Sequence, residues 1–426
     1  MSTQESNPPR SNGKMLPLWG LAALAGAAAW KYSVAQQQVL SFEGLVPPAQ
    51  TVIVDPLQYN AIGKNGNFRK DSYSSYFNPT STAPPFFQAF HPSFFEIIGS
   101  SPSIREIASN PGFAFAHEAP IWIPDTDELF FSSNGGGALG FSDWDNNNQV
   151  AKIDMPEVYG AMAASGSSTS PVNVTVTPLD LPDTVQMTNG GTGPFRSSLL
   201  FINSGRALLP TSLTLVNPVP PHNVTVLLDN FYGRQFNSLN DVKVHPKSKK
   251  IFFTDVTYGF LNHFRPQPLL PNQVYRFDPD TGSIRVVADG FTRPNGLAFS
   301  PDGSIAYIAD TGASGGFLGK NQTDPATIYA FDVDPKSQAY TNRRVFAYID
   351  SGVPDGVQVD AKGNVYSACG DGVHVWDEEG TLIGKFLIGT ESANMVFAGK
   401  GKLVILAETA IYLAQIAVDG PNLAFS

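Results

Sequence analysis

The stretch FTRPNGLAFSPDGSIAYIA, residues 291–309, has the pattern of a strand, a tight turn and a second strand. Its centre, Ser300-Pro301-Asp302-Gly303, has the Pro-Asp-Gly order that favours a reverse turn, and short apolar runs lie on both sides of it. Two other stretches repeat this pattern, SLNDVKVHPKSKKIFFTD (residues 238–255) and VPDGVQVDAKGNVYSA (residues 353–368). A supersecondary unit that recurs after about 55 to 60 residues is typical of β-propeller blades.

The composition agrees with one large all-β domain. Gly (39 residues) and Pro (34 residues) fall between short apolar runs, and charged residues make up only 15% of the chain. Further units are expected from Phe113, from about Val174 to Leu215, from Val224 to about Val274, and from Ala393 to Ile416. Together these units predict a six-bladed β-propeller over residues 113–426, in preference to a pair of β-sandwiches.

The segment before the propeller, residues 36–112, is irregular and rich in aromatic residues and Pro. We expect part of it to supply an outer strand to the last blade, because pairing the two ends of the chain is the simplest way to close a ring of blades. Ser101–Ser109 is expected to form one or two helical turns. In the second unit, Gly190–Gly193 is expected at the start of the innermost strand.

Each repeated stretch places an amide or carboxylate where its first strand begins. Asn240, Asn295 and Asp355 hold this position in three units, and Glu118 holds it in FAFAHEAPIWIPDTDELFFSS, which starts at Phe113. Turn chemistry or an exposed surface explains each residue alone. Recurrence at matching points of four blades favours a shared site, because the innermost strands of a propeller converge on a central channel.

This set of side chains predicts a calcium site. Two carboxylates and two amide carbonyls are hard oxygen donors, and Ca²⁺ binds 6–8 oxygen ligands. Glu118 and Asp355 at close range without a cation would repel each other, which raises at least one carboxyl pKa. A zinc-type site is not indicated, because the single Cys369 and the six scattered His residues lack zinc-ligand spacing.

The N-terminal residues predict export through the secretory pathway. The apolar run Met15–Trp30 follows Arg10 and Lys14, so residues 1–35 are expected to be a cleaved signal peptide or an uncleaved signal anchor. A secreted or membrane-anchored protein with an extracellular or lumenal propeller is then expected, with membrane contact only through residues 15–30. Three Asn-x-Thr triplets predict glycosylation at Asn173, Asn223 and Asn321. The net charge of −10 excludes nucleic acid as an expected partner.

Four segments, HEAPIW, SLNDVKV, RPNGLAFSPDG and VPDGVQVDAKGNVY, resemble the signature segments of the senescence marker protein/gluconolactonase family. Wider relatives of that family are the paraoxonases, diisopropylfluorophosphatase and strictosidine synthase. The long N-terminal region resembles that of fungal secreted lactonohydrolases. The resemblance implies a six-bladed propeller with one divalent cation, usually calcium, on Glu118, Asn295 and Asp355. It also implies that Asn240 contacts the metal or the substrate.

The activity implied by the resemblance is calcium-dependent hydrolysis of a lactone, which is a small-molecule cyclic ester. Asp355, with Glu118, would orient or deprotonate the attacking water. His117 is expected either to carry a proton or to pack against the substrate at the pocket wall. His117 and the insertion at residues 258–271 depart from the family pattern and bear on the choice of substrate.

Two other functions suit the same fold. One is a cyclase or condensing enzyme of secondary metabolism, similar to strictosidine synthase, which would use the channel as an apolar cavity. The aromatic-rich residues 73–95 and the insertion at 258–271 would then form a lid. The other is a propeller that only binds partners. The complete set of four oxygen donors favours the hydrolase over both.

Overall fold

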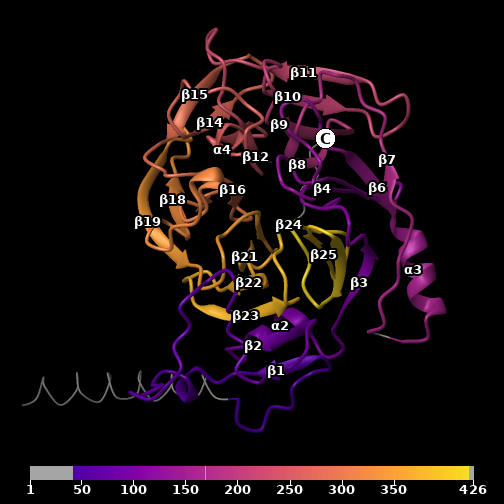
Figure 1. Ribbon diagram of the computed structural model, residues 1–426, viewed down its shortest axis with the longest axis vertical. Helices are drawn as coiled ribbons and strands as arrows, with labels where there is room; N and C mark the ends of the chain where they lie inside the picture. The colour runs from indigo at the N-terminus through magenta and orange to yellow at the C-terminus, as the bar shows by residue number, and fades with distance from the viewer. Residues whose placement is uncertain (1–41, 168, 422–426) are drawn as a thin grey trace, which may run out of the picture. The chain divides into compact units, whose positions relative to one another are not determined.

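The computed structural model describes residues 42–167 and 169–421. Residues 1–44 and 45–426 form separate units, and all helices and strands named below belong to the second unit. Six sheets of four to six strands are arranged around a central axis as the blades of a propeller (Figure 1). The prediction of an all-β, six-bladed propeller is therefore confirmed.

Each blade runs from an innermost strand beside the channel to an outer strand at the rim. Listed from the innermost strand outward, the first three blades contain β4 (Glu118–Ile123), β5 (Glu128–Ser132), β6 (Val150–Asp154) and β7 (Thr177–Pro178); β8 (Thr188–Phe195), β9 (Ser198–Asn203), β10 (Ser212–Val216) and β11 (Val224–Leu228); and β12 (Leu239–Val244), β13 (Ile251–Asp255), β14 (Gln273–Phe277) and β15 (Ile284–Ala288).

The last three blades have the same order of strands. They contain β16 (Pro294–Phe299), β17 (Ile305–Asp310), β18 (Thr327–Val333) and β19 (Tyr340–Tyr348); β20 (Val357–Val359), β21 (Val365–Cys369), β22 (Gly372–Trp376), β23 (Leu382–Leu387), β2 (Phe86–Ala89) and β1 (Thr51–Ile53); and β24 (Asn394–Phe397), β25 (Lys402–Ala407), β26 (Ala410–Gln415) and β3 (Ser103–Ser109).

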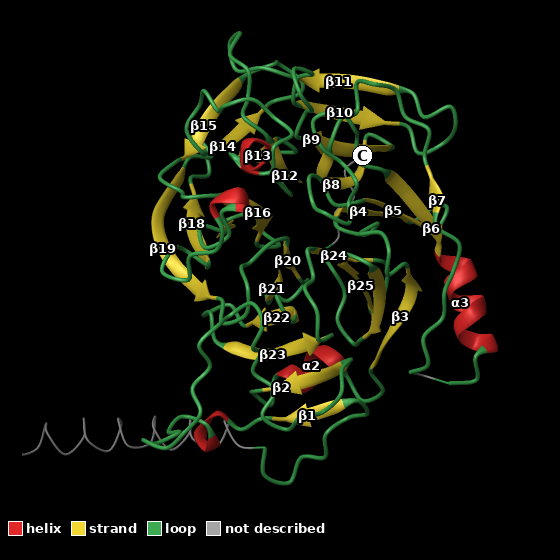
Figure 2. Cartoon of the chain, viewed as in Figure 1, coloured by secondary structure: helices red, strands yellow, loops and turns green. Residues whose placement is uncertain are grey.

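Helices are short in the described residues and lie outside the blades or between their strands (Figure 2). α2 packs on β23 through the edge-to-face contact of Phe94 with Phe386, whose ring centroids lie 6.0 Å apart. α3 lies next to β6 at the rim. The helices are α2 (Phe94–Ile98), α3 (Met155–Ala164), α4 (Tyr258–Leu261) and the 3-10 turns η1 (Pro56–Gln58) and η2 (Gly316–Leu318).

The ring is closed by a strand from the N-terminal part of the chain. β3 pairs antiparallel with β26, from Ala410 opposite Ser109 to Gln415 opposite Ser103. The expected helical turns at Ser101–Ser109 were wrong, because the free edge of β26 supplies backbone partners that no local pattern reveals. Ile104 and Ile107 of this strand are fully buried, which stabilises the closure.

Two further expectations on the second blade need correction. Val224–Leu228 is the outermost strand of that blade, so the third blade begins only at Leu239. Gly190–Gly193 lies inside β8 and not at its start. The glycines there allow adjacent blades to approach closely, since a Cβ on Gly190 would lie 2.6 Å from the Cα of Asp241.

Gly296 in β16 marks a similarly close approach of blades 4 and 5. A Cβ on Gly296 would lie 2.1 Å from the carbonyl oxygen of Asp355. We therefore expect Gly296→Ala to lower the free energy of unfolding by about 1–3 kcal/mol, because the two backbones must separate. Denaturant unfolding followed by tryptophan fluorescence measures this change.

Gly160→Ala is a matched control for Gly296→Ala. Gly160 lies within α3, where an added Cβ meets nothing within 4 Å. This substitution should leave the stability unchanged or raise it by about 0.5–1 kcal/mol, because Ala favours a helix. Equal stability of Gly296→Ala and the parent protein would contradict the close approach of the two blades.

The predicted signal peptide or signal anchor, residues 1–35, lies outside the described residues. Secretion or membrane anchoring therefore stays a prediction. Among the helices at 42–167 and 169–421, none combines the length and the apolar character needed to cross a membrane.

Candidate metal centre in the propeller channel

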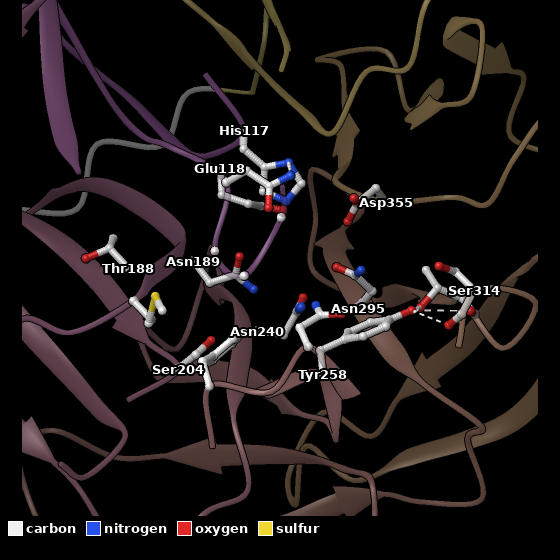
Figure 3. Close-up of a pocket in the computed structure, with 18 of the residues that line it drawn as sticks. His117, Glu118, Thr188, Asn189, Ser204, Asn240, Tyr258, Asn295, Ser314 and Asp355 are labelled. Carbon is white, nitrogen blue, oxygen red and sulfur yellow. Dashed lines mark hydrogen bonds between the residues drawn. The ribbon is translucent and has the colours of Figure 1, made fainter. Parts of the chain in front are cut away.

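A cavity of about 260 Å³ lies where the innermost strands begin. Side chains from distant parts of the chain surround it, and most are polar (Figure 3). The structure brings all the predicted site residues to this cavity: His117, Glu118, Asn240, Asn295 and Asp355. The geometry required for a shared site is therefore present.

Three of these side chains present oxygens that have no hydrogen-bond partner among the described residues. They are the buried Oδ1 atoms of Asn240, Asn295 and Asp355, which come from three consecutive blades. A buried polar atom without a partner costs about 1–3 kcal/mol. Three such oxygens around one cavity fit a cation, which would coordinate them.

Glu118 supplies a second carboxylate at the same place. Ligand atoms of Glu118, Asp355 and His117 lie within 4.8 Å of one another, and Glu118 is only 2% exposed. Its Oε2 accepts a hydrogen bond of 2.7 Å from Nδ2 of Asn394, the residue that starts the innermost strand of the sixth blade. The two carboxylates and the two Asn oxygens form a site of hard donors that suits a divalent ion such as Ca²⁺.

The pKa values of the two carboxyl groups show that two buried negative charges are unfavourable at this short distance. Burial raises the pKa of Glu118 to about 7. Burial, followed by the charge of Glu118, raises the pKa of Asp355 well above its ordinary value. A divalent cation favours the ionised forms and would therefore offset both shifts.

A shared backbone feature positions the site residues of the first four blades. The register between the innermost strand and its neighbour shifts at the start of four blades, where β4, β8, β12 and β16 begin. Such bulges redirect side chains at strand ends. The bulge in β8 includes Asn189, which also lines the cavity.

Asn189 was missed because Gly190–Gly193 was expected at the strand start. Asn189-Gly190 repeats the Asn295-Gly296 pair, and this repetition is the signal that could have identified it.

Asp241, the neighbour of Asn240, connects two blades and does not line the cavity. Its Oδ2 accepts a 3.0 Å hydrogen bond from the backbone N–H of Leu297 in the next blade. Thr254 donates a 3.0 Å hydrogen bond from its hydroxyl to the carbonyl oxygen of Asn295. These buried contacts join blades 3 and 4 and hold the start of β16, so they orient Asn295 without facing the cavity.

His117 forms an ion pair at the cavity wall. Its Nδ1 lies 2.5 Å from Oε1 of Glu408, and Oε2 of Glu408 accepts a 2.9 Å hydrogen bond from Nδ2 of Asn134. Burial lowers the pKa of His117, but the charge and hydrogen bond of Glu408, together with the charges of Glu118 and Asp355, outweigh this effect and raise the pKa to about 10. Glu408 and Asn134 were not predicted, because their contact with His117 arises only when blades 1 and 6 meet.

The three predicted glycosylation sites are not among the residues that line the cavity. Asn173, Asn223 and Asn321 are all exposed, as an acceptor must be. Their glycosylation stays a prediction.

The fold and the site define a six-bladed propeller with a cavity of hard oxygen donors in its channel. Residues 116–409 match the family described as SMP-30/Gluconolactonase/LRE-like region. This match covers well over half of the chain, so the protein belongs to that family. The resemblance inferred from the four sequence segments is confirmed.

Known proteins with similar sequences and structures agree with this assignment. The lactonohydrolase oryL of Aspergillus oryzae is 29% identical over 76% of this chain and 74% of its own. The gluconolactonase of Zymomonas mobilis is 26% identical over 75% of this chain and 82% of its own. A solved gluconolactonase from Xanthomonas campestris shares the fold, with a TM-score of 0.60, 24% identity and coverage of 80% of this chain and 99% of its own.

Proposed function

We propose that this protein hydrolyses lactones at the channel site, with one Ca²⁺ held by Glu118, Asn240, Asn295 and Asp355. The observation that carries the proposal is the convergence of three unpartnered, buried oxygens beside a fourth oxygen donor, Glu118. Similarity to a lactonohydrolase and a gluconolactonase supports the choice of reaction.

The bound ion would supply positive charge that polarises the ring carbonyl of the lactone. Asp355 accepts a proton from water, and the water oxygen forms a bond to the carbonyl carbon. Asn240, at the cavity wall, contacts the substrate and helps to orient its ring. The ring C–O bond then breaks, and the departing alkoxide takes a proton from His117. The product is the open-chain hydroxy acid.

Glu408 acts in this scheme as a positioning residue for His117. We expect Glu408→Gln to lower kcat by about 10- to 100-fold, because the imidazole loses its charged partner and its fixed orientation. KM and the affinity for Ca²⁺ should change by less than about threefold, because Glu408 is not proposed to contact the substrate or the ion. Steady-state kinetics and calcium titration measure the three quantities.

Glu379→Gln, on an exposed turn of the fifth blade, is the control for the loss of a carboxylate. It should leave kcat unchanged. A kcat for Glu408→Gln equal to that of the control would remove Glu408 from the scheme.

A pH-stat assay with small lactones tests the proposed reaction. Purified protein with Ca²⁺ is given glucono-δ-lactone, γ-butyrolactone and δ-valerolactone in turn, and the release of acid is followed above the spontaneous rate. We expect hydrolysis of at least one of them. No acid release from any lactone by folded protein would reject the hydrolase.

The cyclase expected as an alternative is not favoured. Its cavity would be apolar, whereas amides, carboxylates and hydroxyls line most of this one. Tyr258 and Phe264 of the 258–271 insertion do reach the cavity, and they form part of its wall.

A further inference from the structure

Four connections on one face of the propeller surround the cavity. They join the second and third strands of blades 1 to 4, and each contributes polar residues to the cavity wall: Asn134, Ser204, Tyr258 and Ser314. The corresponding connections of blades 5 and 6 are tight turns of two residues, at Gly370-Asp371 and Glu408-Thr409. The face above the site is therefore built mainly by the first four blades.

These four connections contact one another and form a continuous wall. Arg206 donates a 2.8 Å hydrogen bond from Nη1 to the carbonyl oxygen of Trp144, which joins the first two. The backbone N–H of Ala207 donates a 2.8 Å hydrogen bond to the carbonyl oxygen of Phe264, which joins the second and third. The ring of His263 stacks on Phe317 at 4.8 Å, which joins the third and fourth.

Large apolar side chains project from this wall into solvent. The mouth collar consists of six of them, which are between 41% and 78% exposed: Leu139, Phe141, Trp144, Leu208, Phe317 and Leu318. Single exposed apolar side chains need no explanation, but a group carried by the connections that line one cavity marks a surface that binds an apolar partner.

The cavity and the mouth collar differ in polarity and in size. The cavity is lined mainly by amides, carboxylates and hydroxyls, and its 260 Å³ lies below the range of about 300–1,000 Å³ that holds a drug-sized ligand. A small lactone ring fits such a space. Any large substituent on the ring must extend out of the cavity, past the connections that carry the collar.

We propose that the substrate is a lactone with a hydrocarbon substituent, whose ring lies in the cavity and whose chain lies on the mouth collar. This inference rests on the proposed lactone hydrolysis. A substrate tail is favoured over a lipid surface or a second copy of the chain as the partner of the collar, because the same four connections carry the collar and line the cavity.

A series of γ-lactones with one ring and a growing chain tests the inference. The series runs from γ-valerolactone (methyl) through γ-octalactone (butyl) to γ-dodecalactone (octyl), with glucono-δ-lactone as a polar comparison. Each methylene that contacts the collar should raise kcat/KM about twofold, because contact with a surface gives about half the free energy of full burial. From methyl to octyl, kcat/KM should therefore rise about 100-fold. A kcat/KM that is independent of chain length would overturn the proposal.

The double variant Phe317→Ser/Leu318→Ser locates the effect. We expect it to lower the octyl-to-methyl ratio of kcat/KM by about tenfold, because the chain loses apolar contact area. The matched control is Val226→Ser/Val345→Ser, which removes exposed apolar side chains from the outer strands β11 and β19 and should leave the ratio unchanged.

Four other outcomes are informative. An equal loss for both variants would contradict a tail-binding collar. Binding to phosphatidylcholine vesicles that is lost in Phe317→Ser/Leu318→Ser, together with a flat chain-length series, would assign the collar to a lipid surface. Hydrolysis of glucono-δ-lactone or γ-valerolactone without any chain-length effect rejects the tail and keeps the hydrolase, whereas no hydrolysis of any lactone rejects the hydrolase itself.

Discussion

Asp355→Asn is expected to lower kcat/KM for lactone hydrolysis by about 1,000-fold or more while the protein stays folded. The amide keeps the shape of the side chain and one oxygen donor, but it cannot accept a proton from water. The backbone of this residue is held independently, because its N–H donates a 2.9 Å hydrogen bond to the carbonyl oxygen of Ala368. The loss should therefore be one of chemistry and not of structure.

When no cation is bound, Asp355→Asn should keep or raise the stability of the fold, although it lowers activity. Burial and the nearby Glu118 make the ionised form of Asp355 unfavourable, so its pKa is raised. A neutral amide removes this repulsion. In EDTA, the variant should unfold at the same temperature as the parent protein or at a higher one. Activity near that of the parent protein would remove Asp355 from the role of base.

Removal of the divalent ion is the second change for which we expect a large effect. EDTA should reduce lactone hydrolysis by about 100-fold or more, because the polarising charge is lost and the carboxylates repel each other. It should also lower the melting temperature by about 5 °C, since an ion at 100 times its Kd stabilises the fold by about 2.7 kcal/mol. Assays and thermal scans before and after calcium is restored measure both effects.

Magnesium is the control for this experiment. Mg²⁺ requires near-ideal octahedral geometry and gives up its water reluctantly, so it should restore activity less well than Ca²⁺. Full activity in EDTA would contradict a metal-assisted reaction and would reopen the choice of function.

Sequence patterns alone predicted the blades that have strong local turn chemistry. Ser300–Gly303 and its counterparts show where strands turn, and the ring symmetry then brings Asn240, Asn295 and Asp355 together. Glu118 follows from the same reasoning. Position within a repeat was therefore enough to locate four side chains that are distant in sequence.

The parts that were not predicted depend on contacts between distant segments. Asn394 begins the innermost strand of the sixth blade but was not assigned to the site, and its hydrogen bond to Glu118 shows that it belongs there. Glu408 reaches His117 across the junction of the first and last blades. An outer strand for the last blade was expected from residues 36–112, but its position at Ser103–Ser109 was not, because the free edge of β26 that pairs with it cannot be recognised from the local sequence.

We propose above all that four oxygen-bearing side chains hold one hard cation in the channel. Isothermal titration of Ca²⁺ into chelator-treated, desalted protein tests it most directly, with Asn295→Ala and Asp355→Asn measured alongside. We predict one ion per chain, with affinity at least about tenfold weaker in each variant. No binding, or binding that both variants leave unchanged, would contradict it.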